Sequence, residues 1–162
     1  LALALALAGY RTLLLDADLR GGEQHRRFGL NPVPGLSDFL TGTARLWEIV
    51  RDTPHANLSV VGCGHHTRGA ADLLGSERMD ALLRQLCASY HIILCDSPSL
   101  AVGVDPYVLC TLTGNLLVVL REGADSRDFP AATQHMLSRL PARVVGAVIN
   151  TVPAREPNAA CA

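Results

Sequence analysis

The chain contains no lysine, since all 14 of its basic residues are arginine. A phosphate-binding P-loop has the pattern G-x-x-x-x-G-K-[ST], in which the lysine reaches the phosphate oxygens. That pattern occurs nowhere in the 162 residues. The sequence therefore excludes a complete phosphate cradle within the chain, and with it tight binding of a nucleoside triphosphate by these residues alone.

An excess of positive charge is also lacking. The formal net charge is −1, whereas proteins that bind nucleic acid usually present a basic face. We therefore expect no nucleic acid partner. The apolar segment Leu1–Ala8 follows no basic residues and is too short to cross a bilayer, so it has the features of neither a signal peptide nor a membrane span.

The five cysteines include no C-x-x-C pair. Their odd number and the absence of that pair favour a reduced, cytoplasmic compartment. Cys63, His65 and His66 lie close together in the sequence, but their spacing matches no strong zinc pattern and no partner cluster follows. We interpret these three as loop residues in preference to zinc ligands.

A short apolar segment that suits a buried strand, Thr12–Leu15, is followed by Asp16 and Asp18. Residues i and i+2 of an extended chain point to the same side, and open α/β sheets bind ligands at the carboxyl ends of their strands. Two anions held together there need a cation or a proton between them. The pattern indicates Mg²⁺ and a phosphorylated ligand. The alternative is that Asp16 begins a turn and Asp18 caps a short helix.

A second segment repeats this arrangement. Ile92–Leu94 suits a buried strand, Asp96 follows after Cys95, and Ser97 and Pro98 end the strand. The pattern is typical of a Walker B aspartate, which holds Mg²⁺ beside nucleotide phosphates. Two such strands in one chain favour a built site over isolated turn residues.

Strands and helices alternate along the whole chain. The expected strands are Thr12–Leu15, Leu58–Val61, Ile92–Leu94, Leu116–Leu120 and Val144–Ile149. The expected helices are Leu1–Ala8, His25–Phe28, Gly35–Gly42, Ala44–Val50, Ala70–Leu74, Ser76–Ser89 with Ser76 as N-cap, one opened by Asp105 as N-cap with Pro106 after it, and Ser126–Leu140. The alternation predicts an α/β fold of three layers with a mainly parallel sheet. We expect one partial domain over residues 1–150 and a disordered tail over 151–162.

The first residues indicate where this chain stands in a longer one. Leu1–Ala8 alternates leucine with alanine, but both are strong helix formers, and Gly9 stands where a helix-ending glycine belongs. The chain thus opens in the middle of a helix, with Leu in place of Met. We expect a fragment whose beginning lies upstream, so that the first strand and the P-loop of the fold are missing from it.

Six segments form a recognisable set when they are taken in order. They are DADLR (16–20), HRRFGL (25–30), GLSDFLTG (35–42), DLLGSERMDALLRQL (72–86), YHIILCDSP (90–98) and LLVVLREG (116–123). With them the chain resembles the bacterial tyrosine kinases of capsular and exopolysaccharide synthesis, a branch of the P-loop ATPases that includes the partition and division-site ATPases. The aspartate motifs are shared with the wider class, whereas the third and fourth segments point to the kinase branch.

The resemblance implies ATP and Mg²⁺ as cofactors and assigns roles to individual residues. It places Asp16 and Asp18 in a Walker A′ motif, where Asp16 would accept the proton of the attacking tyrosine hydroxyl and Asp18 would help to hold Mg²⁺. Asp96 would be the Walker B ligand of Mg²⁺, and Asn150 would meet the adenine base. Arg20 could pair with phosphate or with the neighbouring carboxylates. A strand-end turn residue is the alternative for Asn150, and an exposed arginine that contributes little is the alternative for Arg20.

The implied function is that of an ATP-dependent protein-tyrosine (auto)kinase domain that regulates capsular or exopolysaccharide synthesis or export, inactive as this fragment. We expect it in the cytoplasm, at the inner face of the plasma membrane through another segment or a partner. The expected partners are a membrane-bound activator or chain-length regulator and further copies in a homo-oligomer. Two alternatives stay open: an ATPase switch of the partition or division-site type, and a degenerate, non-catalytic subunit of a polysaccharide export complex.

Overall fold

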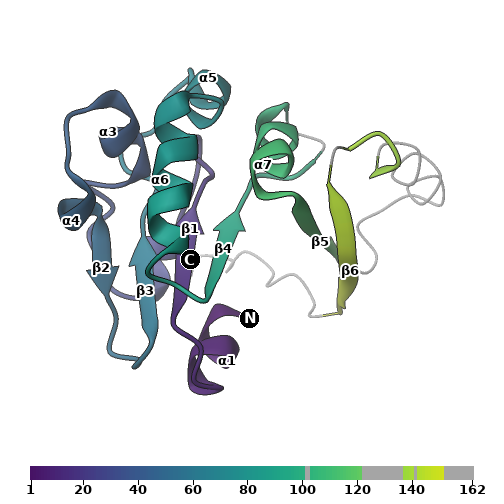
Figure 1. Ribbon diagram of the computed structural model, residues 1–162, viewed down its shortest axis with the longest axis horizontal. Helices are drawn as coiled ribbons and strands as arrows, with labels where there is room; N and C mark the ends of the chain where they lie inside the picture. Colours follow the sequence, from purple (N-terminus) through teal and green to yellow (C-terminus); the bar gives the residue numbers. More distant parts are fainter. Residues whose placement is uncertain (101–102, 122–136, 141, 152–162) are drawn as a thin grey trace, which may run out of the picture. The chain divides into compact units, whose positions relative to one another are not determined.

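The computed structural model describes residues 1–100, 103–121, 137–140 and 142–151 (Figure 1). The chain divides into two compact units, one formed by Leu1–Leu112 and the other beginning at Thr113. Apart from Thr151, the predicted tail lies outside the described residues. So does most of the predicted helix Ser126–Leu140, of which only residues 137–140 are described.

The first unit contains a four-stranded sheet in the order β2-β3-β1-β4 (Figure 1). Its strands are β1 (Thr12–Asp16), β2 (Val50–Asp52), β3 (Leu58–Val61) and β4 (Ile92–Asp96). Its helices are α1 (Ala2–Leu7), α2 (Gln24–Arg27), α3 (Leu36–Thr41), α4 (Leu46–Ile49), α5 (Ala70–Leu74), α6 (Glu77–Cys87) and the greater part of α7 (Asp105–Thr113). Strand β1 runs parallel to both β3 and β4, and β2 is antiparallel to β3. The prediction of an α/β fold with a mainly parallel sheet is confirmed.

Helices cover both faces of this sheet. Successive side chains of β1 point to opposite sides, so that apolar residues of this strand need covering on both faces. Leu13 and Leu15 are fully buried in a core that also holds residues of α3, α5 and α6. Leu14 faces the other way, toward Ala2 and Ala6 of α1. Each fully buried leucine contributes about 2 kcal/mol through removal of its apolar surface from water. Burial on both sides explains why β1 is a continuous apolar run.

Two predicted helix ends are confirmed. Helix α1 stops before Gly9, whose φ of 90° is one that residues with a side chain rarely adopt. Ser76 is the N-cap of α6, and its hydroxyl accepts a hydrogen bond from the Met79 amide over 3.3 Å. Both helices were recognisable because their end signals are local in sequence.

Other boundaries differ from the prediction. The segment Ala44–Val50 was predicted as one helix, but the helix is only α4, and Val50 already belongs to β2. The three residues of β2 show no alternating pattern from which a strand could be predicted. They form a strand through their antiparallel pairing with β3. Asp105 was predicted as an N-cap, yet α7 includes it, and its carboxylate pairs with Arg20.

The described part of the second unit contains a parallel pair of strands, β5 (Asn115–Arg121) and β6 (Arg143–Asn150). Both strands were predicted, each one residue shorter at each end. The pairing shifts register between Leu116 and Leu117. Among the described residues, no helix combines the length and the apolar character that a membrane crossing requires.

Candidate functional site

Asp16 and Asp96 are direct neighbours at the carboxyl end of the sheet. They are the last residues of β1 and β4, and the parallel register pairs one with the other. The Ala17 amide continues the ladder by donating to the Asp96 carbonyl over 2.8 Å. The structure therefore brings together the two carboxylates that the sequence placed at separate strand ends.

Gln24, at the start of α2, holds both carboxylates. Its backbone amide donates to Asp16 Oδ2 over 2.9 Å, and its side-chain Nε2 donates to Asp96 Oδ2 over 2.6 Å. The sequence analysis did not single out Gln24, because a glutamine eight residues after a strand carries no recognisable motif. It is the residue that fixes the orientation of the pair.

The Asp16 side chain is fully buried. The pKa of Asp16 is raised from 3.8 to about 6, chiefly by burial. The hydrogen bond from the Gln24 amide opposes this rise, and the charge of nearby Asp96 contributes to it. Gly22 lies so close that a Cβ there would overlap the Asp16 carboxylate. The surroundings thus place the protonation midpoint of Asp16 near pH 6.

Asp18 has a different environment, two residues beyond the strand. Its Oδ1 accepts the amide hydrogens of Arg20 and Gly21 over 3.1 and 3.0 Å. Asp18 therefore caps a turn, whereas the alternative considered for it was the cap of a short helix. Its role as an Mg²⁺ ligand stays a prediction.

Arg20 pairs with Asp105 rather than with Asp16, Asp18 or Asp96. Its Nε and one terminal nitrogen donate to the two carboxylate oxygens of Asp105, over 2.6 and 3.2 Å. The Asp105 side chain is 2% exposed and that of Arg20 is 43% exposed. The hydrogen bond to this carboxylate raises the pKa of Arg20. The contact fastens the turn after β1 to the start of α7.

We expect Arg20→Gln to lower the midpoint of thermal unfolding, because it leaves the buried Asp105 carboxylate without its cation. Arg26→Gln is the matched control, since Arg26 pairs with Glu23 on the surface over 2.7 Å and both side chains are mostly exposed. Scanning calorimetry of both variants checks the difference. Equal shifts for the two variants would contradict a structural role for the Arg20 pair.

Asn150 is the last residue of β6 in the second unit, where its register partner is Arg121. Asp16, Asp18, Arg20 and Asp96 all belong to the first unit. The predicted contact of Asn150 with an adenine base therefore stays a prediction.

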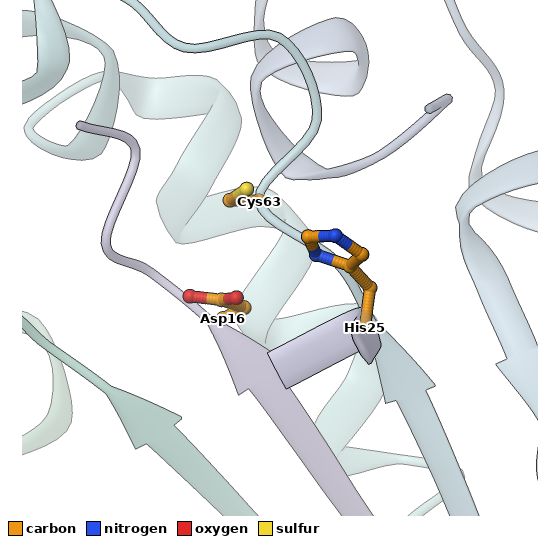
Figure 2. Close-up of side chains that lie close together, drawn as sticks. All are labelled: Asp16, His25 and Cys63. Carbon is orange, nitrogen blue, oxygen red and sulfur yellow. The ribbon is translucent and has the colours of Figure 1, made fainter. Parts of the chain in front are cut away.

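The loop after β3 places Cys63 at the same end of the sheet. Figure 2 shows its thiol beside the Asp16 carboxylate and the His25 ring of α2. Burial and, after it, the charge of Asp16 together raise the pKa of Cys63 to about 11. His65, by contrast, directs Nδ1 to Asp38 Oδ1 over 2.5 Å. Cys63, His65 and His66 lie in a loop, as predicted. The titratable neighbours of Cys63 are Asp16 and His25, however, and not the adjacent histidines.

Sequence comparison relates this site to known proteins. The chain is 30% identical to the tyrosine-protein kinase Ptk of Acinetobacter johnsonii over 152 aligned residues. The alignment covers 94% of the chain and 21% of Ptk. The kinase domain of the Escherichia coli tyrosine kinase ETK superposes with a TM-score of 0.86 at 27% identity, over 99% of the chain and 62% of the ETK chain. The chain is a relative of the bacterial tyrosine kinases. No family model matches it.

The tyrosine-kinase relatives share their fold with a wider class of proteins. The cell division ATPase MinD of Pyrococcus furiosus superposes with a TM-score of 0.73 at 20% identity, over 92% of the chain and 62% of the MinD chain. At that identity the likeness shows the fold alone. The chain thus has a P-loop ATPase fold, and it spans about a fifth of the length of Ptk.

Proposed function

We propose that the chain is part of the nucleotide-binding domain of an ATP-dependent protein-tyrosine kinase. The pairing of Asp16 with Asp96 at the strand ends, in a relative of the bacterial tyrosine kinases, carries this proposal. Asp16 would take the proton of the tyrosine hydroxyl as that oxygen attacks the γ-phosphate. A general base works best when its pKa lies near the working pH, and a pKa of about 6 fits that requirement.

The acidic residues also fit the cofactor that such a reaction needs. Asp18 and Asp96 offer carboxylate oxygens, the ligands that Mg²⁺ prefers, and Asp96 is held in place by Gln24. Bound Mg²⁺ would neutralise charge on the transferring phosphate. The residues present do not fit ATP on their own, since the chain has no P-loop and no lysine. The phosphate cradle of the proposed kinase therefore belongs to a segment outside this chain.

The finer parts of the proposal rest on the sequence motifs that resemble the kinase branch. We place the protein in the cytoplasm at the inner face of the plasma membrane, with a membrane-bound activator or chain-length regulator as partner. It would form a homo-oligomer and regulate capsular or exopolysaccharide synthesis or export. Kinship with the tyrosine kinases, at 27 to 30% identity against 20% for MinD, favours this function over an ATPase switch.

The test uses a parent protein that includes a P-loop upstream of Leu1. We expect Asp96→Asn to lower phosphotyrosine formation with Mg²⁺ and ATP by about 100-fold or more, because it removes a charge that stabilises the transition state. Asp72→Asn is the matched control, since Asp72 lies exposed on α5. Phosphotyrosine on the parent or on a tyrosine-containing peptide, measured beside phosphate release, gives the readout.

The outcomes separate the candidate functions. Phosphate release without phosphotyrosine would favour the division-site type of ATPase switch. A folded parent that lacks a P-loop and shows neither activity would favour the non-catalytic subunit. Undiminished phosphotyrosine formation in Asp96→Asn would remove Asp96 from the site.

A further inference from the structure

Three side chains of different chemistry converge beside the aspartate pair. Asp16 ends β1, His25 lies in α2, and Cys63 follows β3 (Figure 2). One carboxylate oxygen, one ring nitrogen and the thiol sulfur all lie within 4.8 Å of one another. The exposed fractions of the three residues are 0%, 8% and 0%. A carboxylate, an imidazole and a thiol, all buried, thus lie close together.

Two of these side chains have polar atoms without a hydrogen-bond partner. Asp16 Oδ1 and His25 Nδ1 are both buried and make no hydrogen bond. A buried polar atom without a partner costs stability, and native proteins rarely leave one unsatisfied unless an ion, a water or a function requires it. The thiol of Cys63 has one hydrogen for two carbonyl oxygens, those of Gly22 at 3.3 Å and Gly64 at 3.5 Å. The cluster is incompletely satisfied by the protein itself.

We propose that Asp16, His25 and Cys63 form a binding site for a borderline-soft divalent metal ion of the zinc class. Carboxylate oxygen, imidazole nitrogen and thiolate sulfur are the three donors that Zn²⁺ accepts. Mg²⁺ binds oxygen and has little affinity for thiolate. The site therefore differs in ligand type from the predicted Mg²⁺ ligands Asp18 and Asp96. Three protein ligands leave a fourth position of a tetrahedral ion open.

Occupation of this site would engage the Asp16 carboxylate. The zinc-class ion and the tyrosine proton would then compete for the same oxygens, a consequence that rests on the proposed kinase function. Metal binding itself does not depend on that function. It is measured on the present chain without nucleotide or a P-loop, so failure of one proposal can be distinguished from failure of the other.

The experiment is a titration of the metal-free full chain with Co²⁺ and Zn²⁺. We expect one ion per chain, a Co²⁺–thiolate charge-transfer absorption, and displacement of Co²⁺ by Zn²⁺ but not by Mg²⁺. Cys63→Ala should abolish the absorption and weaken Zn²⁺ binding by about 100-fold, and His25→Gln should weaken it by about 10-fold or more. Circular dichroism of each variant establishes that it is folded.

The control variant is Cys87→Ala. Cys87 is exposed on α6 and does not belong to the cluster, so this variant should keep the absorption and the affinity. The proposal is overturned if the folded wild type shows no thiolate absorption, or if the absorption survives in Cys63→Ala. If Cys63→Ala does not fold, unchanged Zn²⁺ affinity in folded His25→Gln overturns it equally.

Discussion

Asp16→Asn is expected to raise the free energy of unfolding at pH 7 by about 3 kcal/mol and to lower tyrosine phosphorylation by the parent protein by about 1,000-fold. Both effects have one cause, the burial of an ionised carboxylate. Asparagine keeps an oxygen that can accept the Gln24 amide hydrogen, which now bonds Asp16 Oδ2 over 2.9 Å. It removes the charge that burial and Asp96 disfavour, and it removes the base.

The sign of the stability effect follows from the pKa of Asp16 in the folded and unfolded chain. The pKa of Asp16 is about 6 in the folded chain, against 3.8 for an unperturbed aspartate. The folded chain therefore holds the proton more tightly than the unfolded chain between these two values, so stability falls as the pH rises through that window. A difference of about two pKa units corresponds to about 3 kcal/mol. Below about pH 4 the penalty is absent, and above pH 6 it is fully present.

Urea denaturation of wild type and Asp16→Asn from pH 4 to pH 7.5, with a chelator present to remove metal ions, measures this difference. We expect the two stabilities to converge toward pH 4 and to separate as the pH rises. Asp72→Asn, on the exposed surface of α5, should follow the wild type throughout. A difference between wild type and Asp16→Asn that does not change with pH would contradict a raised pKa for Asp16.

Gly35→Ala is expected to lower the free energy of unfolding by about 3 kcal/mol, through overlap with main-chain atoms that cannot move aside easily. A Cβ on Gly35 would meet the Gly62 carbonyl oxygen and the amide nitrogen and Cα of Gly64. These approaches are close because the first amides of α3, those of Leu36 and Ser37, donate to the carbonyls of Gly62 and Cys63 over 2.8 and 2.9 Å. The backbone of Gly35 is extended, so the cost comes from the overlap and not from a left-handed conformation.

Gly103→Ala is the matched control for this prediction. Gly103 has no atom within 4 Å of an added Cβ, and its φ lies outside the left-handed region. Its stability should stay within about 0.5 kcal/mol of the wild type, as for most surface substitutions. Chemical denaturation at pH 7 compares the two variants. A loss of similar size at both positions would mean that glycine flexibility, and not the close approach of two backbones, sets the effect.

The same contact ties the stability of the fold to the candidate site. Residues 62–64 accept the first turn of α3 and also carry Cys63 toward Asp16 and His25. Displacement of this loop by Gly35→Ala should therefore weaken the proposed metal site as well. The glycines here serve as points where two main chains approach closely.

Local sequence patterns were sufficient for most elements of the fold. Apolar runs gave β1, β3, β4, β5 and β6, and Ser76 and Gly9 gave the ends of two helices, because strand burial and helix capping depend on residues close together in the chain. The carboxylates after β1 and β4 could be placed at one edge of a sheet for a similar reason, since parallel strands direct their carboxyl ends the same way. Strand β2 was missed, because its three residues become a strand only through pairing with β3.

Only the tertiary structure decided which side chains lie together in one site. Gln24 reaches Asp96 over 72 residues of sequence, Arg20 reaches Asp105 over 85, and Cys63 meets Asp16 and His25 without any motif spacing. The sequence by itself determined the fold class and the kinship with tyrosine kinases, because both can be recognised from short, contiguous segments. It could not determine the surroundings of Asp16, because burial and the contacts that shift a pKa arise only when distant segments pack together.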